Sequence, residues 1–106
     1  MEGGVPALRA RVYLRDSDVV DNAPVHDLVY TLFVEAGVGD VSVHHGTMGF
    51  DRASGLLSLR PLRFHADLPA VVEAVGSREE IEAALAGVRR VLSRGLIMVA
   101  EVELFD

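Results

Sequence analysis

The chain has 106 residues, no cysteine and a formal net charge of −6, with sixteen acidic residues against ten basic ones, all arginine. This length predicts a single domain; the missing cysteines exclude disulfides and thiolate chemistry, and the negative charge argues against a nucleic-acid partner. No apolar run reaches the ~20 residues of a membrane helix, and the start lacks the basic region of a signal peptide. We therefore expect a cytoplasmic protein without direct membrane insertion.

The first half of the chain predicts a strand, a helix and a second strand. Apolar residues alternate with arginine and tyrosine over residues 7–15, which is the pattern of a half-buried strand. Apolar residues then recur with helical spacing from Pro24, expected in the first helical turn, to Gly37, a residue type that often ends helices. Alternation returns over 40–45 and predicts a short strand.

The second half repeats this order after an extended arm. Residues 56–64 have extended character but include Pro61, which cannot donate a hydrogen bond to a sheet. A valine-rich strand is expected over 68–75. Ser77 and Glu80 then have the spacing of a capping box at the start of a second helix.

This order of elements predicts an α+β, ferredoxin-like split βαβ fold (βαββαβ with an extra extended arm). Its antiparallel sheet has two helices on one face. In this fold the strand 7–15 lies between the last strand, 96–105, and the strand 68–75. Residues 1–6 show no periodicity, so we expect a flexible N-terminus followed by a single domain over 7–106.

The sheet face opposite the helices is predicted to mix charged and apolar side chains. We place on it Arg9, Arg11, Tyr13, Glu73, Ile97, Val99, Glu101 and Glu103. Opposite charges on adjacent strands contribute roughly 0.2–1 kcal/mol per pair, and a mixed face of this kind is typical of subunit interfaces. We therefore expect a homo-oligomer, the alternative being a solvent-exposed face with scattered valines.

The segment after the second strand is the candidate ligand-binding site. Gly46 and Gly49 bracket a predicted four-residue turn that ends in Phe50. Glycines allow close backbone approach to a ligand, and arginines bind anions through two hydrogen bonds at once. The arginines that flank this segment are Arg52, Arg60 and Arg63. The alternatives are a plain bend and solvated arginines.

Metal and catalytic chemistry have weaker support in the sequence. Of the four histidines, His44 and His45 are neighbours on a strand and point to opposite faces, so they are poorly placed to bind one ion. We expect His45 to pack partly with Val41 and Val43. No serine or carboxylate lies in a nucleophile or acid–base motif, so we predict no catalytic residues and no enzyme.

Residues along most of the chain match a known family in order and spacing. They are Pro24, Ala36-Gly37-Val38-Gly39, Val41, Val43, Gly46, Gly49-Phe50, residues 67–75 and Gly95-Leu96. In these residues the chain resembles a group of uncharacterised bacterial proteins, a domain of unknown function within the PII-like (nitrogen-regulatory-protein-like) superfamily. Genes of this group are often found near fluoride-exporter genes.

The resemblance implies a trimer that binds a small anionic metabolite between subunits, such as an adenine nucleotide. It also implies that residues 46–62 signal to a partner, either a membrane transporter or another protein. Family members commonly have Arg before the glycine at Gly46 and Gly after the Phe at Phe50. Here these positions hold His45 and Asp51, and both differences disfavour an anion. The alternatives are a ligand-free structural oligomer or protein-interaction module and, third, a metal-binding protein.

Overall fold

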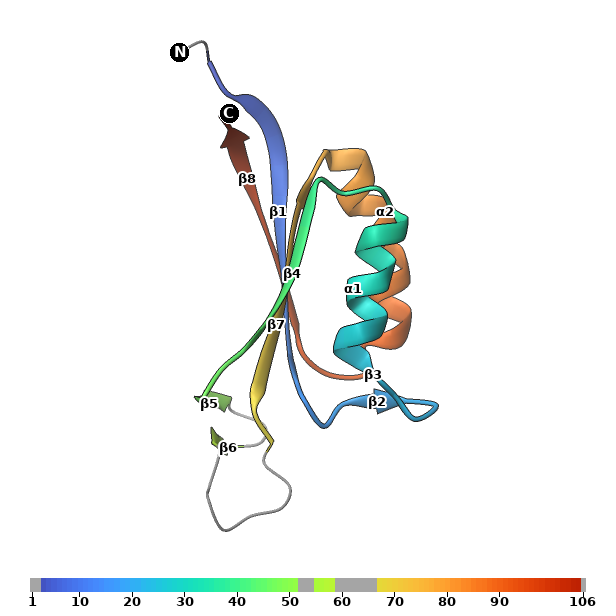
Figure 1. The fold of residues 1–106 in the computed structure, drawn as a ribbon, viewed down its shortest axis with the longest axis vertical. Helices are drawn as coiled ribbons and strands as arrows, with labels where there is room; N and C mark the ends of the chain where they lie inside the picture. The colour runs from blue at the N-terminus through green and yellow to red at the C-terminus, as the bar shows by residue number, and fades with distance from the viewer. Residues whose placement is uncertain (1–2, 52–54, 59–66, 106) are drawn as a thin grey trace.

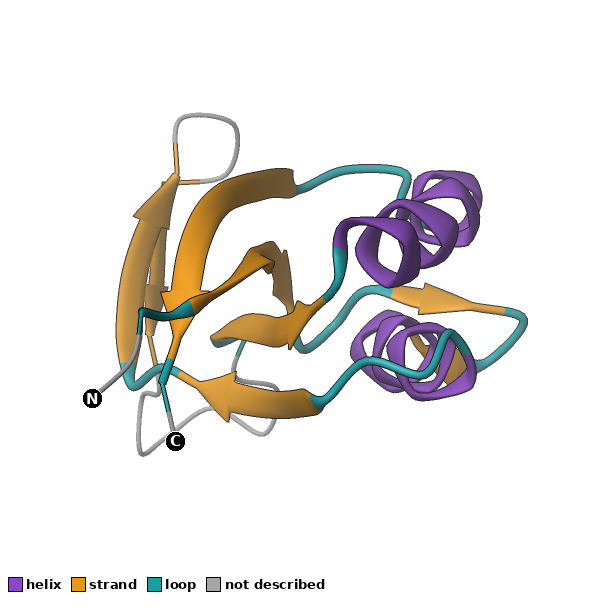
Figure 2. Cartoon of the chain, turned by 90° about the horizontal axis from the view of Figure 1, so that it is seen from above, coloured by secondary structure: helices purple, strands orange, loops and turns teal. Residues whose placement is uncertain are grey.

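The computed structural model describes residues 3–51, 55–58 and 67–105. In chain order its elements are β1 (Val5–Arg15), β2 (Val19–Val20), β3 (Ala23–Pro24), α1 (Val25–Glu35), β4 (Asp40–His45), β5 (Met48–Asp51), β6 (Gly55–Ser58), β7 (Pro69–Gly76), α2 (Arg78–Val91) and β8 (Leu96–Leu104). The main sheet has four antiparallel strands in the order β4-β7-β1-β8, and both helices lie against one of its faces (Figures 1 and 2). The predicted α+β, ferredoxin-like fold is confirmed.

The hydrophobic core lies between the helices and the sheet. Its largest fully buried side chains are Phe33, Ile81, Val12, Val29, Val72 and Val88. Each such side chain contributes about 1.5–3 kcal/mol by leaving water. These residues come from both helices and the two central strands, so their burial fixes the helices over β1 and β7.

Both helices begin and end near the predicted residues. Ser77 and Glu80 form the capping box at the start of α2, since Glu80 N–H donates to Ser77 Oγ at 3.1 Å and Ser77 N–H donates to Glu80 Oε1 at 2.9 Å. Pro24 is the N-cap of α1 rather than a residue of its first turn, and Gly37, with φ of 85°, follows the end of that helix. Helical periodicity therefore located both helices correctly.

The first strand of the domain begins earlier in the sequence than predicted. Val5 and Pro6 belong to β1 and pair with Leu104 and Glu103 of β8. These residues were expected to be part of a flexible end because they show no alternation. The long partner strand β8 supplies hydrogen bonds to their backbone, which side-chain periodicity cannot indicate.

The predicted orientation of β8 was wrong. Residues directly opposite in an antiparallel pair have their side chains on the same face. The fully buried Val12 pairs with Ile97, and the buried Leu8 pairs with Glu101. Ile97, Val99, Glu101 and Glu103 therefore lie on the helix-facing side of the sheet, not on the opposite face.

The opposite face of the sheet, which we term the outer face, keeps the rest of the predicted set. Arg9, Arg11 and Tyr13 alternate with buried residues of β1, and Glu73 of β7 pairs with Arg11. The β8 residues that pair with Arg9, Arg11 and Tyr13 are, in that order, Ala100, Met98 and Leu96. Apolar residues occur at both parities of β8, and a shift of one residue exchanges its two faces. Alternation alone could not choose between them.

Candidate functional site

A cavity of about 620 Å³ lies at the end of the main sheet where β1 and β4 finish and β7 and β8 begin. Small-molecule sites commonly measure about 300–1,000 Å³. Residues that line it include Tyr13, Arg15, Gly46, Gly49, Pro69 and Arg94. Two of the predicted ligand-binding residues, Gly46 and Gly49, thus share one cavity.

Gly46 and Gly49 allow the backbone to pass close to Pro69. A Cβ atom added at Gly46 would lie 2.7 Å from Pro69 Cγ, and one added at Gly49 would lie 3.0 Å from the same atom. The Gly46 N–H also donates to the Pro69 carbonyl at 2.8 Å. Neither glycine has positive φ, which among the described glycines is confined to Gly37 and Gly95. Gly46 and Gly49 are therefore needed because a side chain would collide with Pro69, and not because of their backbone conformation.

The segment that contains Phe50 is a hairpin where a turn was predicted. Met48–Asp51 forms β5, which pairs with β6, Gly55–Ser58. The backbone groups of two consecutive short segments pair here, and the glycine spacing did not reveal this pairing. Arg52, Arg60 and Arg63 lie outside the described residues, so their role in binding an anion stays a prediction.

Two arginines that were not predicted as site residues supply positive charge to the cavity. Arg94 Nε donates to Asp18 Oδ1 at 2.7 Å, and its side chain is 51% exposed. Arg15 lies with Nη1 3.5 Å from Asp67 Oδ2. Arg94 lies in the loop between α2, which ends at Val91, and β8. The strand directions could have predicted that Arg15 and Arg94 lie close together. Arg15 ends β1 and Arg94 comes just before β8, and the end of one strand lies beside the start of its antiparallel neighbour.

Asp18 anchors this end of the molecule. Its side chain is 9% exposed, and Asp18 Oδ2 accepts a hydrogen bond from the Arg15 N–H at 3.0 Å. Its backbone carbonyl accepts one from the Val25 N–H, at 2.8 Å. Asp18 thus joins the end of β1, the start of α1 and, through Arg94, the loop before β8.

The two neighbouring histidines point to opposite faces of β4, as predicted. His44 pairs with Val71, on the outer face, and its Nε2 is 2.8 Å from Ser42 Oγ. His45 pairs with the buried Ala70 on the helix-facing side, which Val41 and Val43 share. There its Nδ1 lies 2.7 Å from Asp16 Oδ1.

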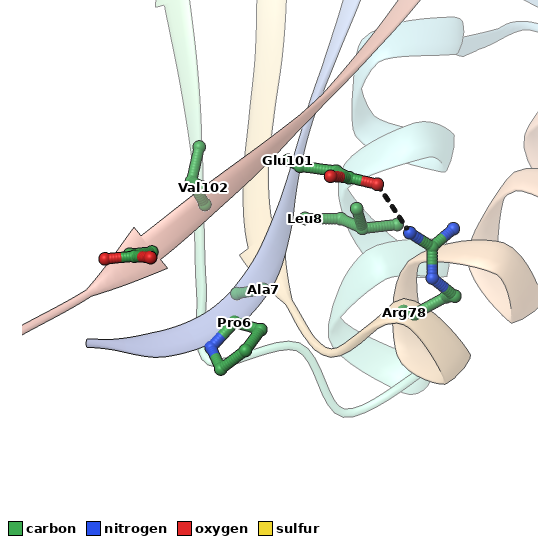
Figure 3. A pocket seen from close by; sticks show the side chains of 7 residues that line it. Pro6, Ala7, Leu8, Arg78, Glu101 and Val102 are labelled. Atoms are coloured by element: carbon green, nitrogen blue, oxygen red, sulfur yellow. Dashed lines mark hydrogen bonds and ion pairs between the residues drawn. The ribbon is translucent and has the colours of Figure 1, made fainter. Parts of the chain in front are cut away.

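A second cavity, of about 480 Å³, lies near the opposite end of the sheet. Arg78, at the start of α2, reaches across it to Glu101 of β8 with a separation of 3.1 Å (Figure 3). Glu103 also lines this cavity. Two carboxylates and one arginine give the lining of this cavity a net negative charge, so it is less suitable for an anion than the first cavity.

A family model, DUF190, described as "Uncharacterized ACR, COG1993", matches residues 7–104. The chain belongs to the DUF190 family. The prediction of a family of uncharacterised proteins is confirmed by this match.

The fold of this DUF190 chain is similar to that of CPII, a nitrogen regulatory PII-like protein from Thiomonas intermedia K12. The CPII structure bound to ADP, AMP and bicarbonate has a TM-score of 0.70 at 16% identity, over 94% of this chain and 89% of that chain. The CPII structure bound to ADP, AMP and acetate has a TM-score of 0.69 at 13% identity, over 100% and 94%. GlnK of B. subtilis has a TM-score of 0.52 at 16% identity, over 92% and 86%.

The outer face of the DUF190 chain combines an ion pair with exposed apolar residues. Arg11 Nε donates to Glu73 Oε2 at 2.7 Å, and hydrogen bonds with Glu73 and then Tyr13 raise the pKa of Arg11 above its usual value. A guanidinium is charged throughout the ordinary pH range, so Arg11 supplies a constant positive charge to the outer face. Beside this pair, Leu96 and Met98 are 60% and 43% exposed. Within the described residues, no helix has the length and apolar character needed to span a membrane.

Proposed function

We propose that this DUF190 protein is a PII-like regulator that binds a small anionic metabolite and signals its presence to a partner protein. The observation that carries the proposal is the 620 Å³ cavity, where Gly46 and Gly49 meet two arginines at the end of the sheet. An adenine nucleotide is the first ligand to test, because the CPII structures with this fold contain ADP and AMP.

The residues that line the cavity support a nucleotide as the ligand. Arg94 is half exposed and forms an ion pair with Asp18. The remaining N–H groups of its guanidinium can donate hydrogen bonds to a phosphate. Tyr13, Met48 and Leu96 line the same cavity and offer aromatic and apolar surface for a base. One part of the cavity therefore suits an anion and another part suits a flat apolar group.

A second subunit would complete the site. Tyr13, Pro69, Val71 and Leu96 line the cavity and lie on the outer face of the sheet. We propose that outer faces pack together in a homo-oligomer, with a trimer as the expected state, so that the ligand lies between subunits. A regulatory role is proposed rather than a catalytic one.

Calorimetry with ATP, ADP, AMP and cyclic AMP, each with and without bicarbonate, tests ligand binding. Arg94→Gln is expected to weaken binding by about 10- to 100-fold, since hydrogen bonds to charged groups contribute about 1.5–3 kcal/mol. Arg90→Gln, in the last turn of α2, is the matched control and should leave affinity unchanged. No heat with any of these ligands at millimolar concentration would contradict the proposal.

The exposed apolar residues of the outer face favour a second candidate, a ligand-free oligomer or protein-interaction module. The double change Arg60→Ala with Arg63→Ala distinguishes this candidate from the ligand-binding regulator. Loss of ligand affinity with unchanged oligomer mass supports the regulator. Loss of partner binding alone supports the interaction module, and native mass spectrometry reads oligomer mass and retained ligand together.

A further inference from the structure

Three potential metal ligands from separate parts of the chain meet beside the cavity. Asp16 follows the end of β1, His26 lies in the first turn of α1, and His45 is the last residue of β4. One ligand atom from each lies within 4.8 Å of the other two. The rings of His26 and His45 meet edge to face, with centroids 5.2 Å apart and an interplanar angle of 88°.

The ligand atoms of Asp16 and His26 are buried, and the one on His26 has no polar partner among the described residues. Asp16 Oδ1 and His26 Nδ1 each expose less than 1 Å², and His26 Nδ1 has no hydrogen-bond partner among the described residues. Asp16 Oδ1 lies 2.7 Å from His45 Nδ1, so two of the three residues already contact each other. Most buried polar atoms have a partner, so the unpartnered His26 Nδ1 calls for an explanation.

The other ring nitrogen of His26 has the environment of a metal-binding histidine. His26 Nε2 lies 3.4 Å from Asp27 Oδ1. Histidines that bind metals commonly present their second nitrogen to a carboxylate, which favours the tautomer with its lone pair on the ligating nitrogen. In this chain that arrangement leaves the buried Nδ1 as the ligand.

We propose that Asp16, His26 and His45 bind one divalent transition-metal ion. Two imidazoles and one carboxylate suit zinc or ferrous iron and leave at least one coordination position open. Ligands around tetrahedral zinc lie about 3.4 Å apart, given bond lengths of about 2.1 Å, so separations of up to 4.8 Å here need only small side-chain movements to bind an ion. The side chain of His45 is 46% exposed and also lines the cavity, so the open position can face solvent or a cavity ligand.

Zinc titration of the full, untagged chain, after treatment with a chelator, tests this site. Calorimetry and native mass spectrometry should show one ion per chain. His26→Gln and Asp16→Asn should each lower the affinity by about 100-fold or more, since even the outer-shell partners of metal ligands are worth about 10–100-fold. His44→Gln is the matched control, because His44 is the next residue on the same strand but faces the other way. It should bind zinc like the wild type.

The proposal is independent of nucleotide binding, so its test contains no nucleotide. Imidazole signals of the wild-type protein, followed by NMR during the titration, provide a readout that needs no variant to fold. Those of His26 and His45 should shift together with one equivalent of zinc, while those of His44 stay in place. The absence of binding at millimolar zinc would overturn the site. Equal loss of affinity in His44→Gln and His26→Gln would also overturn it, as would a shift of His44 alone.

Discussion

Gly95 determines how the chain passes from α2 into β8. Its φ is 123°, and an added Cβ atom would lie 2.5 Å from the Tyr13 carbonyl oxygen. Backbone must move to relieve this contact, so Gly95→Ala should lower the free energy of unfolding by about 1–3 kcal/mol. Urea denaturation checks the prediction. Gly39→Ala is the control, because its nearest contact would be an ordinary 3.7 Å, and an equal loss there would contradict the explanation.

Asp18 illustrates the effect of a buried carboxylate that holds several partners. Asp18→Asn removes the charge that pairs with Arg94, and we expect a loss of about 1–3 kcal/mol in unfolding free energy. Glu82→Gln is the comparison, because its ion pair with Arg78 is 3.4 Å long and exposed, and such pairs are worth about 0–1 kcal/mol. Chemical denaturation of both variants should give clearly different midpoints. Similar midpoints would mean that Asp18 is not an anchor.

At the scale of a single element, the capping box of α2 is open to direct test. Ser77→Ala leaves the Glu80 N–H without its 3.1 Å acceptor and should cost about 0.5–2 kcal/mol. Thermal unfolding followed by circular dichroism measures the effect. Ser93→Ala, beyond the end of the helix, should leave the melting temperature nearly unchanged. If the two variants melt alike, the cap does not stabilise α2.

The residues of β8 were predicted correctly, but the face of this strand that meets the core was not. Its location followed from a run of extended, apolar residues after Gly95. The choice of face depends on pairing with β1, where Val12 lies opposite Ile97. Since apolar residues occupy both faces of this edge strand, burial pattern and alternation do not distinguish the two orientations.

At the scale of the whole molecule, the two faces of β8 make a sharp test of the proposed oligomer. Met98 on the outer face and Val99 on the helix-facing side are adjacent, and each is 43% exposed. Met98→Glu should lower the molar mass measured by light scattering towards that of a monomer, because a charge would be buried at the interface. Val99→Glu should preserve the oligomer. The reverse result would place the interface on the other face.

The cavity could be predicted only in part. Gly46 and Gly49 attracted attention because glycines often mark close approach, and both do line it. Arg94 was not among the predicted site residues, because no local pattern links it to Gly46 or Gly49. Its contact with Asp18 joins two loops far apart in the sequence. Long-range contacts of this kind follow from the packing of elements and leave no local pattern.

Sequence patterns were enough to predict the two helices, the four strands of the main sheet, their order and the fold class, but not the short β2–β3 and β5–β6 pairs. Periodicity, the Ser77 and Glu80 capping box and the glycines after each helix are local signals, and local backbone preferences act through neighbouring residues. The face of β8 that meets the core, and the meeting of Asp16, His26 and His45, became visible only in the three-dimensional packing. These features depend on strand register and on the ends of distant elements, which are fixed when the whole core packs.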